Sequence, residues 1–92
     1  MAMATNTALL SKVVLARRLL ESGVGQRVRL ASGISMGEMA AQVQIDQSAF
    51  ARWEAGTRVP RPAAAIRYLA ALADLLGAMQ NPDDLERLLA DG

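Results

Sequence analysis

Apolar and polar positions alternate with a helical period of three to four residues through most of the chain. The first apolar stripe keeps this spacing through Gly23 and is interrupted only by Arg17. This continuity favours one long helix from about residue 7 to Ser32, kinked at its glycines. Two helices broken near Gly23 are the alternative. The stripe consists of Leu10, Val13, Leu20, Val24, Val28 and Ala31.

A strong start signal follows this segment. Ser35 can cap a helix over 36–43, and Glu38 three residues later can reach back, which is the pattern of a capping box. Gln44-Ile45 then turns the chain.

A second short helix is predicted over 47–55. Asp46 is a good N-cap, and Gly56 is a natural terminator. The spacing of Phe50 and Trp53 places both on the inner side of this helix, where core packing is the better interpretation of the two rings. The opposite side carries a short polar face, formed by Gln47, Ser48, Ala51, Arg52 and Ala55.

Two further helices complete the predicted bundle. Pro62 suits the first position of a helix that runs to about Leu76 or Met79. The run Asn81-Pro82-Asp83-Asp84 predicts a last helix from 82 to about 90. We therefore expect one all-α domain over 1–92, a compact bundle of about five helices. Its expected parts are an N-terminal helical extension (1–22), a core (23–79) and a short C-terminal helix (80–92).

Composition supports this fold class and limits the chemistry. Alanine, leucine and arginine are strong helix formers, and the alternation typical of strands is absent from the sequence. The chain has no cysteine and no histidine, which excludes disulfides, a thiolate or zinc site and a Ser-His pair. A glycine-rich phosphate loop is also absent. The sequence predicts no enzyme and no cofactor.

Charge is distributed unevenly along the chain. From Lys12 to Arg67 there are nine basic and four acidic residues, a balance of +5, whereas residues 68–92 hold one basic and five acidic residues, a balance of −4. A basic body with an acidic end suits a domain that docks one face on phosphates. Arg17, Arg18 and Arg27 either extend this basic surface or are simply solvated.

The polar face of the 47–55 helix has the chemistry of a DNA-reading surface. Gln47 can bond adenine, Arg52 can bond guanine, Ser48 can bond bases or a phosphate, and Ala51 can contact a thymine methyl group. A helix of this length fits a DNA major groove. In helix-turn-helix proteins the first residues of the second helix reach the base edges.

The segment from about Val28 to Leu76 resembles the Cro and phage-repressor type of helix-turn-helix domain, also called the XRE-like family. The matching positions are Val28-Arg29, Gly33-Ile34-Ser35, Glu38-Met39-Ala40, Val43, Ile45, Phe50, Arg52-Trp53-Glu54, Gly56 and Pro60. The match covers about half of the chain in ungapped register. Met36 departs from the family's usual glutamine, which removes a side-chain phosphate contact, and Gly37 weakens its helix. Gln44 stands where the turn of the family usually has glycine. A non-glycine residue in the left-handed conformation costs about 1 kcal/mol or more, so this turn is either strained or differently shaped.

The resemblance implies roles for several residues. Arg29 would pair with Glu54 and fix the recognition helix. Arg58 and Arg61, with Thr57, would hold the DNA backbone in the loop after that helix, and arginine suits phosphate geometrically. Backbone N–H groups at Met36 and Gly37 would hold another phosphate.

The sequence thus predicts a cytoplasmic, sequence-specific regulator of transcription that binds double-stranded DNA, with a homodimeric repressor as the leading hypothesis. The N-terminal run is too short and too charged for an export signal or a membrane span. Three apolar surfaces compete as the dimer interface: the N-terminal extension, the 62–79 helix and the last helix. The alternative is an antitoxin or antirepressor that mainly binds another protein.

Overall fold

The computed structural model describes residues 2–78 of the chain, with side chains from residue 8 onward. The described residues form five helices and no strand, which confirms the all-α class. The helices are α1 (Ala2–Glu21), α2 (Val24–Ala31), α3 (Met36–Val43), α4 (Gln47–Ala55) and α5 (Pro62–Ala78). The predicted helix from 82 to 90 lies outside the described residues.

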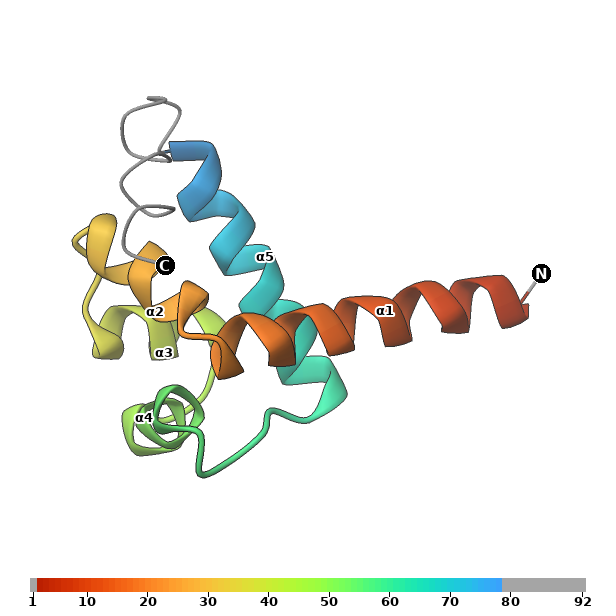
Figure 1. Cartoon of the computed structure of the whole chain (residues 1–92), viewed down its shortest axis with the longest axis horizontal. Coiled ribbons are helices and arrows are strands. Elements are labelled where there is room, and N and C mark those ends of the chain that lie inside the picture. The colour runs from red at the N-terminus through yellow and green to blue at the C-terminus, as the bar shows by residue number, and fades with distance from the viewer. Residues whose placement is uncertain (1, 79–92) are drawn as a thin grey trace.

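Two long helices, α1 and α5, cross and pack on each other, and the three short helices gather around the C-terminal end of α1 (Figure 1). The N-terminal half of α1 projects away from the other helices. On the packed half, Val13, Ala16 and Leu20 are buried. A part of the segment expected to be an extension therefore contributes directly to the core.

The single long helix favoured by the sequence is wrong, and the alternative with a break near Gly23 is confirmed. Gly23 has a φ of 84°, a left-handed conformation that ends α1 and starts α2 at a new angle. Glycine adopts this conformation without a clash at Cβ. The helix also begins earlier than expected, at Ala2.

Three aromatic rings hold α4 to α5. Phe50 and Trp53 of α4 and Tyr68 of α5 are all buried, and their ring centroids lie 6.0 to 6.1 Å apart. Tilted and edge-to-face rings at this separation interact favourably in addition to burying apolar area. The predicted inner side of the 47–55 helix is confirmed.

Tyr68 also meets α2 at close range. A Cβ atom added to Gly25 would collide with the Tyr68 hydroxyl, so this contact needs glycine. Within the described part of the chain the hydroxyl has no hydrogen-bond partner. Burial raises the pKa of Tyr68 well above its ordinary value, because the charged phenolate would lose its hydration.

Helices α2, α3 and α4 end in the same way. A left-handed residue stands within two positions of each helix end: Gln44 (φ 65°) and Gly56 (φ 80°) directly follow α3 and α4, and Gly33 (φ 73°) follows α2 after Ser32. The paired backbone bonds of a Schellman motif close each end, for example from Gly56 N to Trp53 O at 3.1 Å and from Thr57 N to Arg52 O at 3.0 Å. Gln44 therefore occupies a strained position that the other two turns give to glycine.

Candidate nucleic-acid interface

Helix α4 presents the side chains predicted to read bases. Gln47, Ser48 and Arg52 are exposed, and Ala51 is half-buried beside them, whereas Phe50 and Trp53 on the other side are buried. The helix starts at Gln47, directly after Asp46 at the N-cap, and stops at Gly56. The boundaries predicted for both short helices agree with the structure.

An acidic group borders this polar face. The Asp46 carboxylate accepts a hydrogen bond of 2.6 Å from the Ser48 hydroxyl. This bond is the main reason why the pKa of Asp46 lies below its ordinary value. Ser48 must therefore exchange or share this bond before its hydroxyl can donate to a base or phosphate, whereas its oxygen can still accept a hydrogen bond.

The start of α3 lies against the start of α4. The capping box forms as predicted: the Ser35 hydroxyl accepts from Glu38 N at 3.1 Å, and Glu38 Oε1 accepts from Ser35 N at 2.9 Å. The bond from the Ser35 backbone lowers the pKa of Glu38. A Cβ on Gly37 would lie 3.1 Å from the Gln47 Oε1 atom, so Gly37 makes room for Gln47.

The structure thus brings a predicted phosphate-binding position and a predicted base-reading side chain together. The backbone N–H groups of Met36 and Gly37 lie in the first turn of α3, where amides lack intrahelical acceptors. The Met36 side chain is half-buried and packs against the core. Only its backbone is therefore suited to a phosphate contact.

A buried ion pair fixes the end of α4 to α2. Arg29 Nε donates to Glu54 Oε2 and Arg29 Nη2 donates to Glu54 Oε1, both at 2.8 Å. Arg29 Nη1 also donates to the Ile34 carbonyl at 2.9 Å. The side chains are only 6% and 2% exposed, and the bond to Glu54 raises the pKa of Arg29. This bidentate pair fixes the orientation of α4 relative to α2.

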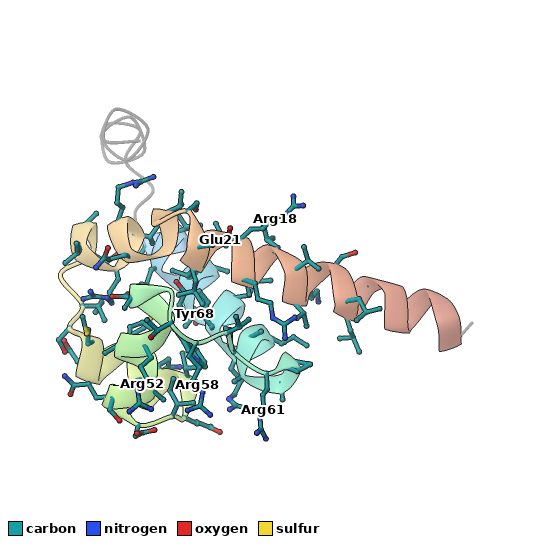
Figure 2. All side chains as sticks on the ribbon, turned by 60° about the horizontal axis from the view of Figure 1, so that its bottom comes forward. Arg18, Glu21, Arg52, Arg58, Arg61 and Tyr68 are labelled. Atoms are coloured by element: carbon teal, nitrogen blue, oxygen red, sulfur yellow. The ribbon has the colours of Figure 1, made fainter. Side chains whose placement is uncertain are left out.

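The loop after α4 contains the residues predicted to contact the DNA backbone. Thr57, Arg58 and Arg61 are exposed, and the Thr57 hydroxyl donates to the Arg52 carbonyl at 3.3 Å. Figure 2 shows Arg52, Arg58 and Arg61 along one edge of the molecule. The loop and the outer face of α4 therefore form a common basic surface.

The other arginines proposed for this surface lie elsewhere. Arg18 is exposed on the opposite edge in Figure 2, and Arg27 is half-buried with its Nε atom out of contact with solvent. Arg17 is half-buried and donates from Nε (3.2 Å) and Nη2 (2.9 Å) to the Pro60 carbonyl. Sequence reasoning missed this bond, although an arginine within an apolar stripe signals a charge that needs a buried partner.

The arrangement of α3, the Gln44 turn and the outward face of α4 defines a helix-turn-helix unit. The model of a family described as "Helix-turn-helix domain" matches residues 26–89, and the chain belongs to this DNA-binding family. Comparisons with curated proteins and with solved structures gave no match. None of the helices within residues 2–78 is long and apolar enough to cross a membrane.

Proposed function

We propose that this protein is a sequence-specific regulator of transcription of the Cro and phage-repressor type, which represses by occupying an operator in double-stranded DNA. One observation carries the proposal. The outer face of α4 exposes Gln47, Ser48 and Arg52, while the Arg29–Glu54 pair and the aromatic cluster hold its inner face. A helix held in this way, with exposed amide, hydroxyl and guanidinium groups, matches the major-groove edges of adenine and guanine.

Selection of binding sites from random duplex DNA tests this function. The chain should enrich one sequence. The double substitution Gln47→Ala, Arg52→Ala should abolish that preference, since each bidentate base contact discriminates by about 1–3 kcal/mol. A matched control is Gln42→Ala, Arg18→Ala, which removes the same groups from exposed positions on α3 and α1. Unchanged specificity in the first variant would refute the assignment of α4.

The proposed contacts with the DNA backbone should differ from base contacts in their dependence on sequence and salt. Arg58→Ala should weaken binding to every sequence and make the salt dependence shallower by about one unit, because a phosphate contact carries no sequence information. Its exposed position in the loop supports this role. A fall in affinity confined to the selected site would instead assign Arg58 to base reading.

A homodimer is part of the proposal, because one short recognition helix reads few base pairs. Dimers of this class bind half-sites about 34–36 Å apart. Within the described residues, large apolar side chains are exposed on α1 (Leu10, 63%; Leu15, 49%; Val14, 47%) and on α5 (Leu76, 41%). Light scattering of Leu10→Glu and Leu76→Glu compares the two helices as interfaces, since a charge in the true interface should give monomers.

The exposed apolar residues of α1 also favour the second candidate, a module whose main partner is another protein. In that case Leu10→Glu would release a co-purifying protein and leave the mass of the free chain unchanged. The same variant would retain any affinity for DNA. Loss of both dimerisation and operator binding would favour the repressor instead.

A further inference from the structure

We propose that Arg17 is a positioning residue for DNA binding: from α1, it holds the loop 56–61 so that Arg58 and Arg61 face the DNA backbone. This inference rests on the proposed function. It assigns to α1 a role in the interface although α1 lies outside the helix-turn-helix unit. Arg17 itself would not touch the nucleic acid.

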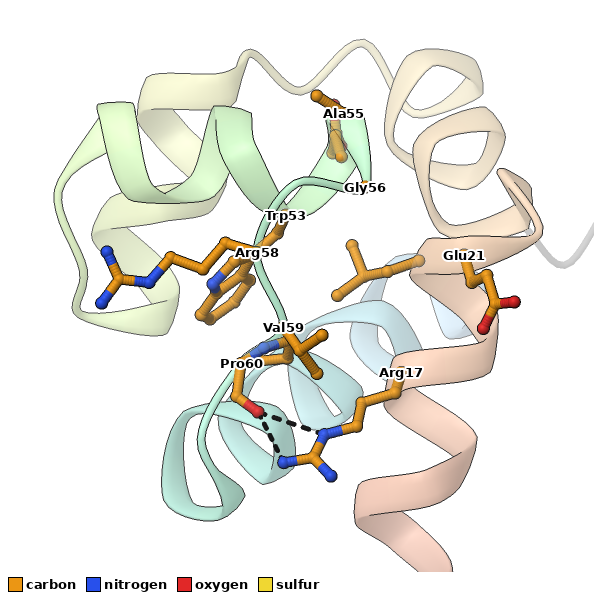
Figure 3. A pocket seen from close by; sticks show the side chains of 10 residues that line it. Arg17, Glu21, Trp53, Ala55, Gly56, Arg58, Val59 and Pro60 are labelled. Carbon is orange, nitrogen blue, oxygen red and sulfur yellow. Dashed lines mark hydrogen bonds between the residues drawn. The ribbon is translucent and has the colours of Figure 1, made fainter.

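The contact is specific in its geometry. Two nitrogens of one guanidinium, Nε and Nη2, converge on a single oxygen, the Pro60 carbonyl, at 3.2 and 2.9 Å (Figure 3). The two residues are 43 positions apart in sequence. Pro60 is buried and Arg17 is half-buried, so solvent competes weakly for the bond.

The loop needs such a partner at this position. Its first residues are fixed by the Schellman motif at the end of α4, and Arg61 O already accepts from Ala65 N at 2.8 Å in the first turn of α5. Between these anchors the buried Pro60 carbonyl would be costly without a donor. Arg58 and Arg61 stand two residues before and one residue after Pro60 in the chain, so fixing this carbonyl restrains both.

The orientation of Arg17 separates it from the phosphate contacts. In Figure 3 the Arg17 guanidinium faces the Pro60 carbonyl, and Arg58 extends past Trp53 away from it. A cleft of about 610 Å³ lies between α1 and the loop, with Leu20, Trp53 and Val59 among its walls. The Arg17 bond therefore joins the loop to α1 across the rim of a cleft.

Arg17→Met tests the proposal, with Arg18→Met as the matched control. Both remove one positive charge from neighbouring positions of α1, but Arg18 is exposed on the edge opposite Arg58 and Arg61. Arg17→Met should weaken binding to the selected duplex about tenfold, as expected for the loss of one charge-assisted hydrogen bond, and Arg18→Met much less. Arg17→Lys, which retains one donor, should fall between them.

A second measurement distinguishes positioning from direct contact. In a background of Arg58→Met, Arg61→Met, the additional effect of Arg17→Met should shrink to that of Arg18→Met, because no phosphate-binding side chain remains to be positioned. A full tenfold loss in that background would overturn the proposal, since Arg17 would then contact DNA itself. Equal affinities of Arg17→Met and Arg18→Met in the parent chain would also overturn it.

Hydrogen exchange of the free protein separates this inference from the proposed function. The amides of Thr57, Arg58 and Val59 should exchange faster in Arg17→Met than in Arg18→Met, while α5 stays protected. Unchanged loop exchange would overturn the positioning role even if DNA binds. Should the unaltered chain bind no duplex, the proposed function fails and the DNA role of Arg17 with it, whereas the exchange data still decide whether Arg17 holds the loop.

Discussion

The two faces of α4 differ in almost every physical respect. The inner face is buried, ring-packed and tied to α2 by a doubly hydrogen-bonded ion pair. The outer face is exposed, and its described side-chain bond, from Ser48 to Asp46, lies at the surface. The helix thus separates two tasks by side: one set of residues fixes the orientation of the helix, and the other remains available to a partner.

This separation has an energetic consequence. Substitutions on the inner face should change the free energy of unfolding, whereas substitutions on the outer face should change recognition and leave stability within about 0.5 kcal/mol. The comparison can therefore be tested by paired variants of the same helix, and then extended to the contacts and turns that support it.

The largest effect is expected for Glu54→Ala. This variant leaves the Arg29 guanidinium buried without its carboxylate, and removing one partner of a buried pair costs about 3–5 kcal/mol. Urea denaturation followed by circular dichroism measures the loss. Arg52→Ala, on the outer face of the same helix, is the control and should change stability little. Equal losses of unfolding free energy in the two variants would contradict the proposed difference between the two faces of α4.

A smaller loss is expected for Gly25→Ala, because the new methyl group meets the Tyr68 hydroxyl. Overpacking of a core costs about 1–3 kcal/mol. Tyr68→Phe removes the buried hydroxyl and should be neutral or stabilising by itself. The double variant should therefore recover much of the loss in a calorimetric comparison. If the changes in unfolding free energy of the two single variants simply added in the double variant, the alanine would clash with backbone atoms and not with the hydroxyl.

The Gln44 turn should respond in the opposite direction. Gln44→Gly should stabilise the fold by roughly 0.5–1 kcal/mol, since relief of the left-handed strain exceeds the entropy that glycine adds to the unfolded chain. Gly56→Gln is the reciprocal control at the equivalent turn of α4, and should destabilise. Base preference in site selection should stay unchanged for Gln44→Gly, because the outer face of α4 is preserved.

The smallest effect concerns pH. The Ser48 bond lowers the pKa of Asp46 below its reference of 3.8, so this carboxylate stabilises the fold above that value and the contribution is lost as the pH falls through the folded-state pKa. Ser48→Ala should raise the pKa of Asp46 toward the reference value with little change in stability at neutral pH. A carbon NMR titration of the Asp46 carboxyl group measures this, with exposed Ser11→Ala as the control.

Local signals in the sequence were sufficient for the parts of the fold that depend on neighbouring residues. Ser35 and Glu38 are three positions apart, and their reciprocal bonds form as the spacing predicts. Gly56 and Pro62 mark a helix end and a helix start for equally local reasons. The resemblance to phage repressors added the Arg29–Glu54 pair, which joins residues 25 positions apart.

Two features could not be found in this way. The apolar spacing is the same on both sides of Gly23. Periodicity therefore cannot reveal a change of helix direction made by a single left-handed residue. The bond from Arg17 to Pro60 depends on how α1 lies against the loop after α4, which no local pattern encodes. The roles of the exposed residues in DNA binding stay predictions, since their exposure allows a contact without demonstrating one.

The aromatic cluster gives this protein an intrinsic fluorescence probe. The chain has one phenylalanine, one tryptophan and one tyrosine, and all three rings lie together between α4 and α5. Intrinsic fluorescence and energy transfer from tyrosine to tryptophan therefore report on a single place, the contact between α4 and α5. Any event that shifts α4 on its support should change the emission spectrum, with no added label.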